Sequence, residues 1–136
     1  MTKKKEKRPR VVVGVLAKRG DKYLLVKEKL EGGQEWWIVP GGGVEWGESI
    51  EEAIKRELHE ETKLITKSVK HLGVKEAIAT KYDYHSVIFF YEAEVHDGEA
   101  SFEEKILEGG WFSAEEAKEL RLVFSAEWLF KESGLL

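Results

Sequence analysis

The sequence predicts an α/β fold in which a mixed sheet is covered by helices on its faces. Runs of β-branched and apolar residues bounded by turn residues are typical of strands. They predict strands at residues 10–18, 22–29, 36–39, 69–79 and 84–95. Apolar spacing of three and four residues predicts a long helix at 49–63, and shorter helices are predicted at 113–120 and 125–131. Three strands, one helix, two strands and two helices in this order suit one sheet packed against helices.

The composition is that of one globular domain. The chain has 136 residues, of which 42% are apolar and 35% charged, so a packed core beneath a polar surface is expected. The net charge of −4 argues against a protein that coats nucleic acid, because such proteins carry an excess of lysine and arginine. The absence of cysteine excludes disulfides, cysteine zinc sites and thiol nucleophiles, and favours a cytoplasmic location.

The beginning of the sequence is basic and leads into an apolar run. We expect residues 1–9 to form a flexible basic tail and residues 10–136 to form the single domain. The run from Val11 to Ala17 is short and leads directly into charged residues, so we interpret it as a strand rather than a secretory signal. No run approaches the roughly 20 apolar residues that a membrane span needs, so no membrane association is expected.

Glycine, proline and serine mark the predicted ends of the elements. Residues 19–21 (Arg-Gly-Asp) predict a hairpin between the first two strands. Pro40 and the three glycines after it predict a rigid corner in which unusual backbone dihedrals are allowed. A polar loop is predicted at 99–110. Capping boxes at two helix starts are predicted from the pairs Ser49 with Glu52 and Ser113 with Glu116.

The long predicted helix carries acidic residues on its apolar face. At about 100° per residue, Glu57 and Glu61 fall within about 35° of the centre of that face, whereas Glu60 lies outside it. A carboxylate buried there without a partner would cost several kcal/mol or take up a proton. The negative end of the helix dipole, beside Glu60 and Glu61, adds to this cost. Arg56 can pair with Glu52 and Glu60, but it points away from the apolar face.

These acids have two interpretations. A solvated acidic surface suits Glu51, Glu52 and, in part, Glu60. It does not suit Glu57 and Glu61, which face inward together. Because clustered carboxylate oxygens suit a hard divalent cation, the sequence predicts a site for Mg²⁺ or Mn²⁺.

The stretch from Gly42 to Leu64 resembles the signature of the Nudix hydrolase superfamily, which includes the MutT-like proteins. The pattern is G-x5-E-x7-R-E-U-x-E-E-x-G-U, where U is aliphatic, and one fixed position departs from it. The matching residues are Gly42, Glu48, Arg56, Glu57, Leu58, Glu60, Glu61 and Leu64. Lys63 replaces the glycine that would end the helix in the left-handed conformation, at a cost of about 1 kcal/mol. This departure questions the helix end and leaves the carboxylates in place.

The resemblance implies a Nudix-type α/β/α sandwich that hydrolyses the pyrophosphate bond of a nucleoside diphosphate linked to another group. It implies that the divalent metal is held by Glu57, Glu60, Glu61 and the backbone carbonyl of Gly42. It also implies that Arg56 orients these carboxylates and that Glu48 supports the loop by pairing or hydrogen bonding. Because all signature carboxylates are present, an enzyme is favoured over a nucleotide-sensing module that has lost catalysis.

The base that activates the attacking water stays open. In some relatives it lies on the signature helix, which here offers Glu57 and Glu61. In others it is a glutamate of a later loop, and the candidates in FEEKILEGGWF are Glu103, Glu104 and Glu108. Glu108 is slightly preferred, because its position three residues before Trp111 is similar to the spacing in many relatives. An ordinary exposed acidic loop is the alternative for each of them.

Residues outside the signature select the substrate. The aromatic candidates for stacking on a nucleobase are Trp46, Tyr82 and Tyr84, although packing or surface placement suits each of them equally. Tyr82 matches a tyrosine found in diadenosine polyphosphate hydrolases, but the glycines at 41–43 differ from their usual lead-in. The segment PGGGVEWGE is most similar to ADP-ribose or nucleotide-sugar hydrolases, and next to enzymes that clear (oxidised) nucleoside triphosphates. The expected partner is therefore a small nucleotide. The number of metals stays open, as does the oligomeric state, for which many relatives suggest a homodimer.

Overall fold

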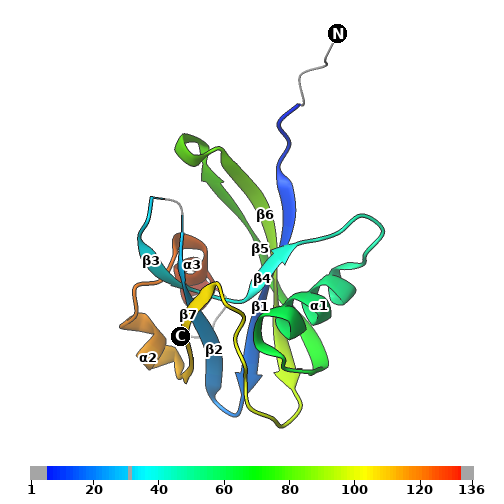
Figure 1. Ribbon diagram of the computed structural model, residues 1–136, viewed down its shortest axis with the longest axis vertical. Helices are drawn as coiled ribbons and strands as arrows, with labels where there is room; N and C mark the ends of the chain where they lie inside the picture. The colour runs from blue at the N-terminus through cyan, green and yellow to red at the C-terminus, as the bar shows by residue number, and fades with distance from the viewer. Residues whose placement is uncertain (1–5, 31, 133–136) are drawn as a thin grey trace.

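The computed structural model describes residues 6–30 and 32–132, without the side chain of residue 132 (Figure 1). The elements in chain order are β1 (Arg10–Arg19), β2 (Lys22–Lys29), β3 (Glu35–Ile38), β4 (Gly41–Gly43), α1 (Ile50–Thr62), β5 (Thr66–Ala79), a 3-10 turn (Thr80–Tyr82), β6 (Tyr84–Val95), β7 (Ile106–Phe112), α2 (Ala114–Lys118) and α3 (Phe124–Glu132). The strands and helices expected from the sequence are present, with small differences at their ends. Of the expected tail, residues 1–5 lie outside the described residues, and residues 6–9 are exposed without helix or strand.

The strands of the described residues form one mixed sheet. Its path is β3-β2-β1-β6-β5, with β4 paired to β1 and β7 paired to β2. The pair β1 and β6 is parallel, whereas the other pairs are antiparallel. The apolar run of β6 suits its place between β1 and β5, where both faces of the strand are covered. The expected mixed sheet is confirmed.

Helices cover both faces of this sheet (Figure 1). On one face, Leu58 of α1 packs in an apolar cluster with Val15 of β1. On the other face, Leu129 of α3 packs in a second cluster with Leu16 of β1. Successive residues of β1 thus supply opposite cores, as the alternation of a strand requires. The α/β/α sandwich is confirmed, and no described helix has the length and apolar character to cross a membrane.

Residues 41–43 form a strand, which corrects the expectation of a corner with unusual dihedrals. Gly42 pairs with Val13 of β1, and the glycines with positive φ in the described residues lie elsewhere. These glycines supply space instead. A Cβ on Gly41 would lie 2.0 Å from the carbonyl oxygen of Val13, and one on Gly42 would lie 2.5 Å from Oε1 of Glu57. The bare backbone of β4 therefore approaches both its neighbouring strand and the acidic face of α1.

The second half of the predicted polar loop is the strand β7. It pairs with β2, and a register shift occurs between Lys27 and Glu28. The glycines that suggested a loop have a packing role, because a Cβ on Gly109 would lie 2.3 Å from the ring of Phe102. The loop prediction was wrong here because glycine and charge concealed the strand pattern.

The bounds of α1 agree with the sequence prediction, but of the two bonds of the predicted capping box at Ser49 the described residues show only one. The Ser49 hydroxyl accepts a hydrogen bond from the Glu52 N–H at 3.1 Å. Lys63 has φ 64° and ψ 5°, and its N–H donates to the carbonyl of His59 at 2.9 Å. The helix therefore ends in the usual left-handed cap, formed by lysine in place of glycine. At the start of α2, both bonds of the predicted capping box are present.

Candidate active site

The acidic face of α1 lies against β4. The side chains of Glu57 and Glu61 are 12% and 2% exposed, whereas that of Glu60 is 54% exposed. The carboxylate of Glu57 lies over Gly42, and Oε2 of Glu61 accepts a hydrogen bond from the N–H of Gly41 at 2.7 Å. The predicted separation of two inward acids from one outward acid is confirmed. The two inward carboxylates meet successive residues of β4.

Arg56 binds several of the signature acids at once. Its bonds are Nε to Glu48 Oε2 at 2.6 Å, Nη2 to Glu48 Oε1 at 2.8 Å, Nη1 to Glu57 Oε1 at 2.8 Å, Nη1 to Glu60 Oε2 at 3.3 Å and Nη2 to the Gly43 carbonyl at 3.0 Å. The hydrogen bond from Arg56 is the main reason that the pKa of Glu48 falls to about 2. Arginine suits this position because its planar fork binds a carboxylate through two parallel bonds.

The sequence-based expectation for Arg56 is partly wrong. Its pairing with Glu60 is present, but the structure pairs it with Glu48 and Glu57 rather than with Glu52. The guanidinium reaches beyond its own helix because the segment after β4 offers a two-oxygen carboxylate and a backbone carbonyl. The helical wheel, which places only the start of a side chain, could not predict this reach.

Lys105 holds a second group of acids, and sequence reasoning missed it. Its Nζ lies 3.2 Å from Oε1 of Glu61 and 3.2 Å from Oε1 of Glu103. Burial raises the pKa of Glu61 to about 7, although the charge of Lys105 opposes the rise. Burial also raises the pKa of Glu28, and Lys105 again opposes the rise. The available signal was a single lysine among the acids of FEEKILEGGWF.

Backbone bonds hold the segment before β7 against the end of α1. The N–H of Ser101 donates to the carbonyl of Thr62 at 2.8 Å, and the N–H of Glu103 donates to the carbonyl of Glu61 at 3.0 Å. These carbonyls belong to the last turn of the helix, where backbone acceptors lack partners within the helix. The segment is thereby fixed so that Glu103 and Lys105 lie beside Glu61.

The three loop candidates for the base lie in different surroundings. Glu103 shares Lys105 with Glu61. Glu104 is exposed. Glu108 lies in β7, where its carboxylate is 3.2 Å from Nζ of Lys27 on β2. The described contacts therefore join Glu103, and not the preferred Glu108, to the acids of α1.

The donor set fits a hard divalent cation. Oε1 of Glu61 is buried and makes no hydrogen bond within the described residues, and carboxylate oxygens are the ligands that Mg²⁺ and Mn²⁺ favour. Among those same residues, no three side chains of His, Cys, Asp or Glu already converge as metal ligands. Arg56 holds Glu57 and Glu60, and Lys105 holds Glu61. A metal shared by these acids competes with the basic side chains for their carboxylate oxygens.

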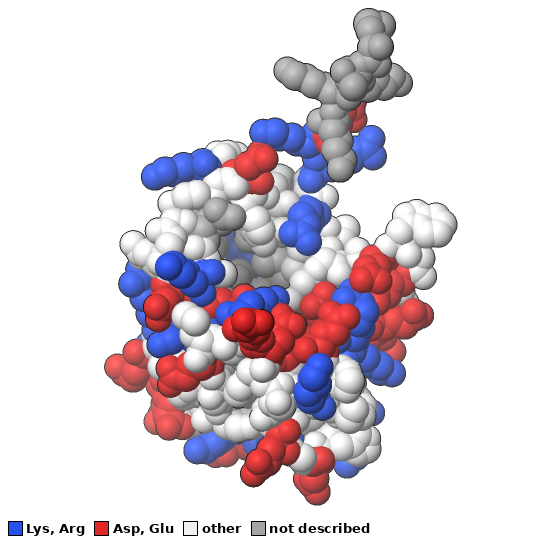
Figure 2. Space-filling view, in the orientation of Figure 1, with Lys and Arg blue, Asp and Glu red and all other residues white. Residues whose placement is uncertain are grey.

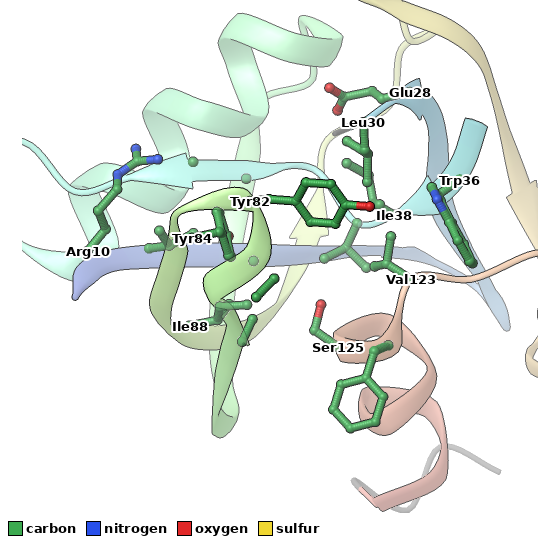
Figure 3. A pocket seen from close by; sticks show the side chains of 18 of the residues that line it. Arg10, Glu28, Leu30, Trp36, Ile38, Tyr82, Tyr84, Ile88, Val123 and Ser125 are labelled. Atoms are coloured by element: carbon green, nitrogen blue, oxygen red, sulfur yellow. The ribbon is translucent and has the colours of Figure 1, made fainter. Parts of the chain in front are cut away.

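A cavity of about 1000 Å³ opens beside this site. Its lining includes Glu28, Lys105 and Ser125, and Figure 3 shows Glu28 and Ser125 on opposite sides of the cavity. Tyr82, at the tip of the β5–β6 hairpin, extends across the cavity (Figure 3). Figure 2 shows a hollow in this face of the molecule, bordered by a band of acidic side chains with basic ones among them. The aromatic residues that line the cavity are Trp36, Tyr82, Tyr84, Phe90 and Phe124.

The aromatic candidates from the sequence separate into two classes. Tyr82 and Tyr84 line the cavity, whereas Trp46 is fully exposed on the segment between β4 and α1. Trp36 is an additional lining residue that sequence reasoning missed. The guanidinium of Arg121 lies 4.1 Å from the centroid of its ring. The alternation of strand β3 could have indicated it, because Trp37 faces the core and its neighbour must face the other way.

Comparison with known proteins agrees with this geometry. The family model of the NUDIX domain matches residues 7–131. The ADP-ribose pyrophosphatase of Methanocaldococcus jannaschii is 32% identical over 124 residues, which cover 91% of this chain and 72% of that protein. The nucleoside triphosphatase NudI of Enterobacter sp. is 26% identical over 140 residues, which cover 95% of this chain and 99% of that protein.

Solved structures share the fold. The MutT NUDIX hydrolase from Burkholderia pseudomallei is similar with a TM-score of 0.84 and 28% identity, over 92% of this chain and 98% of that one. The NUDIX domain of Shewanella oneidensis NrtR, solved in complex with ADP ribose, has a TM-score of 0.76 and 20% identity, over 93% of this chain and 86% of that one. The second similarity concerns the fold alone. From the matched domain and the related hydrolases, the chain belongs to the Nudix family of hydrolases, which act on phosphorus-containing anhydrides.

Proposed function

We propose that the protein hydrolyses the pyrophosphate bond of nucleoside diphosphates linked to a second group, with ADP-ribose or a nucleotide sugar as the first choice. The observation that carries this proposal is the composition of the cavity wall. Trp36, Tyr82 and Tyr84 offer aromatic faces for a nucleobase, while Gly42 and Lys105 bring the same cavity to the acidic site. A diphosphate bound at the acids can therefore carry its nucleoside into the cavity.

The metal site is proposed to consist of Glu57, Glu60, Glu61 and the Gly42 carbonyl. A divalent ion bound there neutralises phosphate charge and lowers the pKa of a bound water. We expect Mg²⁺ first and Mn²⁺ second. The chain's own contribution is orientation, since Arg56 fixes Glu57 from one side while it is itself anchored on Glu48.

We propose Glu103 as the base that accepts the proton of the attacking water. The support is its position, since its backbone N–H bonds to the Glu61 carbonyl and its carboxylate reaches Lys105. Glu108, which the spacing to Trp111 favoured, is paired with Lys27. Replacing Glu103 with Gln should lower kcat far more than replacing Glu108 with Gln, and the reverse result would restore Glu108 as the candidate.

The size of the cavity and the two relatives frame the choice of substrate. About 1000 Å³ is at the upper end of ordinary ligand pockets, which suits a nucleoside with an attached group. The ADP-ribose pyrophosphatase of M. jannaschii supports this class. The triphosphatase NudI supports nucleoside triphosphates as the second candidate, and diadenosine polyphosphates come third through Tyr82.

We also expect a cytoplasmic protein. The oligomeric state, monomer or homodimer, can be measured by sedimentation.

A substrate panel tests this proposal. ADP-ribose, nucleotide sugars, diadenosine polyphosphates and (oxidised) nucleoside triphosphates would each be incubated with Mg²⁺ or with EDTA, and released nucleotides separated by chromatography. We expect nucleoside monophosphate from ADP-ribose or a nucleotide sugar, and only with Mg²⁺. Fastest release from triphosphates would select the second candidate. Binding without turnover of any member would instead support a nucleotide-sensing module and contradict the enzyme.

A further inference from the structure

Lys105 joins the proposed metal site to the cavity. Its ammonium contacts Glu61, a proposed metal ligand, and Glu103, the proposed base, at 3.2 Å each. It also lines the cavity in which the diphosphate is proposed to bind. A cation thus stands between two carboxylates at the border of acids and cavity.

The acids divide between two basic residues. Arg56 takes Glu48, Glu57 and Glu60. Lys105 takes Glu61 and Glu103. Oε1 of Glu61, the atom nearest to Lys105, is buried without a hydrogen bond among the described residues. The ammonium of Lys105, at 3.2 Å, is therefore the positive charge that this oxygen faces in the described part of the chain.

The fold itself places Lys105 beside Glu61. The segment before β7 is fastened to the end of α1 by backbone bonds from Ser101 and Glu103. The next residue along β7, Ile106, is buried. The backbone on either side of Lys105 is thus held in place, while its side chain is 50% exposed. Because a lysine side chain is flexible, the ammonium of Lys105 can move away from the two carboxylates and return while the backbone stays in place.

We propose that Lys105 takes the place of a divalent cation between Glu61 and Glu103, so that the site binds one divalent cation fewer than its carboxylates would otherwise hold. This inference rests on the proposed metal site and deepens it. An ammonium and a divalent cation repel each other, so both cannot share Oε1 of Glu61 without cost. The lysine supplies one positive charge for the substrate's phosphates from the chain itself.

Mn²⁺ binding to the full chain tests the proposal without reference to activity. Electron paramagnetic resonance counts free Mn²⁺ against protein for the wild type, Lys105→Gln, Lys105→Arg and Lys55→Gln. Lys55 is the matched control, because it is an exposed lysine on α1. Circular dichroism confirms that each variant is folded.

We expect Lys105→Gln to bind one Mn²⁺ more per chain than the wild type, because the ammonium no longer occupies the place between Glu61 and Glu103. Lys105→Arg, which keeps the charge, and Lys55→Gln should both match the wild type. Equal binding by wild type and Lys105→Gln would overturn the inference and leave the metal site standing. A gain in Lys105→Arg would overturn it too, because charge would then not be the cause. If neither wild type nor Lys105→Gln bound Mn²⁺, the proposed metal site would fall together with the inference.

Discussion

Arg56 and Lys105 each gather acidic side chains around one positive charge, but their contacts differ in kind. Arg56 binds Glu48 through two parallel bonds and reaches Glu57 as well, and its side chain is 22% exposed. Lys105 makes longer contacts of 3.2 Å. A guanidinium is a rigid planar fork, whereas an ammonium is a point charge on a flexible stem.

The difference divides the site into a fixed part and an adjustable part. Around Arg56 the partners constrain one another, so Glu57 is held in one orientation over Gly42. Around Lys105 the buried acid is less satisfied, and its raised pKa reflects burial that the lysine only partly offsets. The rate of hydrolysis, which needs fixed metal ligands, should depend most on the part around Arg56. Changes of pH and of metal occupancy should act most on the part around Lys105.

The largest effect is expected from Glu57→Gln in the fixed part. The loss of a charged ligand should lower kcat/KM on the order of a thousandfold, while the fold, measured by circular dichroism, stays intact. Glu51→Gln is the matched control, since Glu51 is an exposed acid on the same helix. Near-normal Mg²⁺-dependent rates in Glu57→Gln would show that the metal assignment is wrong.

The next effect contrasts the two parts through pH. In EDTA, Glu61→Gln should stabilise the protein at pH 8 by about 3 kcal/mol, because a buried charge disappears. The pKa of Glu61 is raised from 4.5 to about 7 on folding. Its protonated form therefore favours the folded state below pH 4.5, and that stability is lost as the pH rises through 7. The gain from the variant should vanish below pH 4.5 in urea unfolding curves.

In the same unfolding experiment, Glu48→Gln should change the free energy of unfolding in the opposite direction. The pKa of Glu48 is lowered to about 2, chiefly by its hydrogen bond from Arg56. Its stabilising contribution is thus present above pH 4.5 and lost as the pH falls through 2. Glu48→Gln should therefore destabilise the protein at neutral pH. The same sign for both variants would erase the distinction between the two parts.

Exchanging the basic residues measures the difference between fork and point charge. Arg56→Lys keeps the charge but loses the parallel bonds, and should lower the free energy of unfolding by about 2 kcal/mol. Lys105→Arg should change it little, since the side chain is half exposed and its contacts need only a charge. Urea unfolding at neutral pH measures both. Equal losses in the two variants would contradict the assignment of Arg56 as the fixed centre.

Much of this arrangement could be predicted from the sequence, because it depends on local periodicity. The strand runs, the helix over residues 49–63 and the inward direction of Glu57 and Glu61 all follow from residue spacing. The strands β4 and β7 could not be predicted, because their glycines serve close packing rather than turns. The contacts of long side chains could not be predicted from residue spacing either. Arg56 and Lys105 find partners in segments that only the fold brings together.

Replacing Lys63, at the end of α1, gives the smallest expected effect on stability. The sequence identified it as a departure from glycine, and the structure gives it φ 64°, the conformation that glycine adopts without strain. Lys63→Gly should therefore stabilise the protein by about 1 kcal/mol, seen as a raised Tm. The lysine charge beside the negative end of the helix dipole offsets part of this gain. In the described bonds, Lys63 caps the helix through its backbone and contacts neither Arg56 nor Lys105. The rate of hydrolysis and the pH dependence of stability that comes from Glu61 should therefore stay unchanged. A loss of activity would mean that the geometry of this helix end, from which Glu60 and Glu61 project, is tuned by the strained lysine itself.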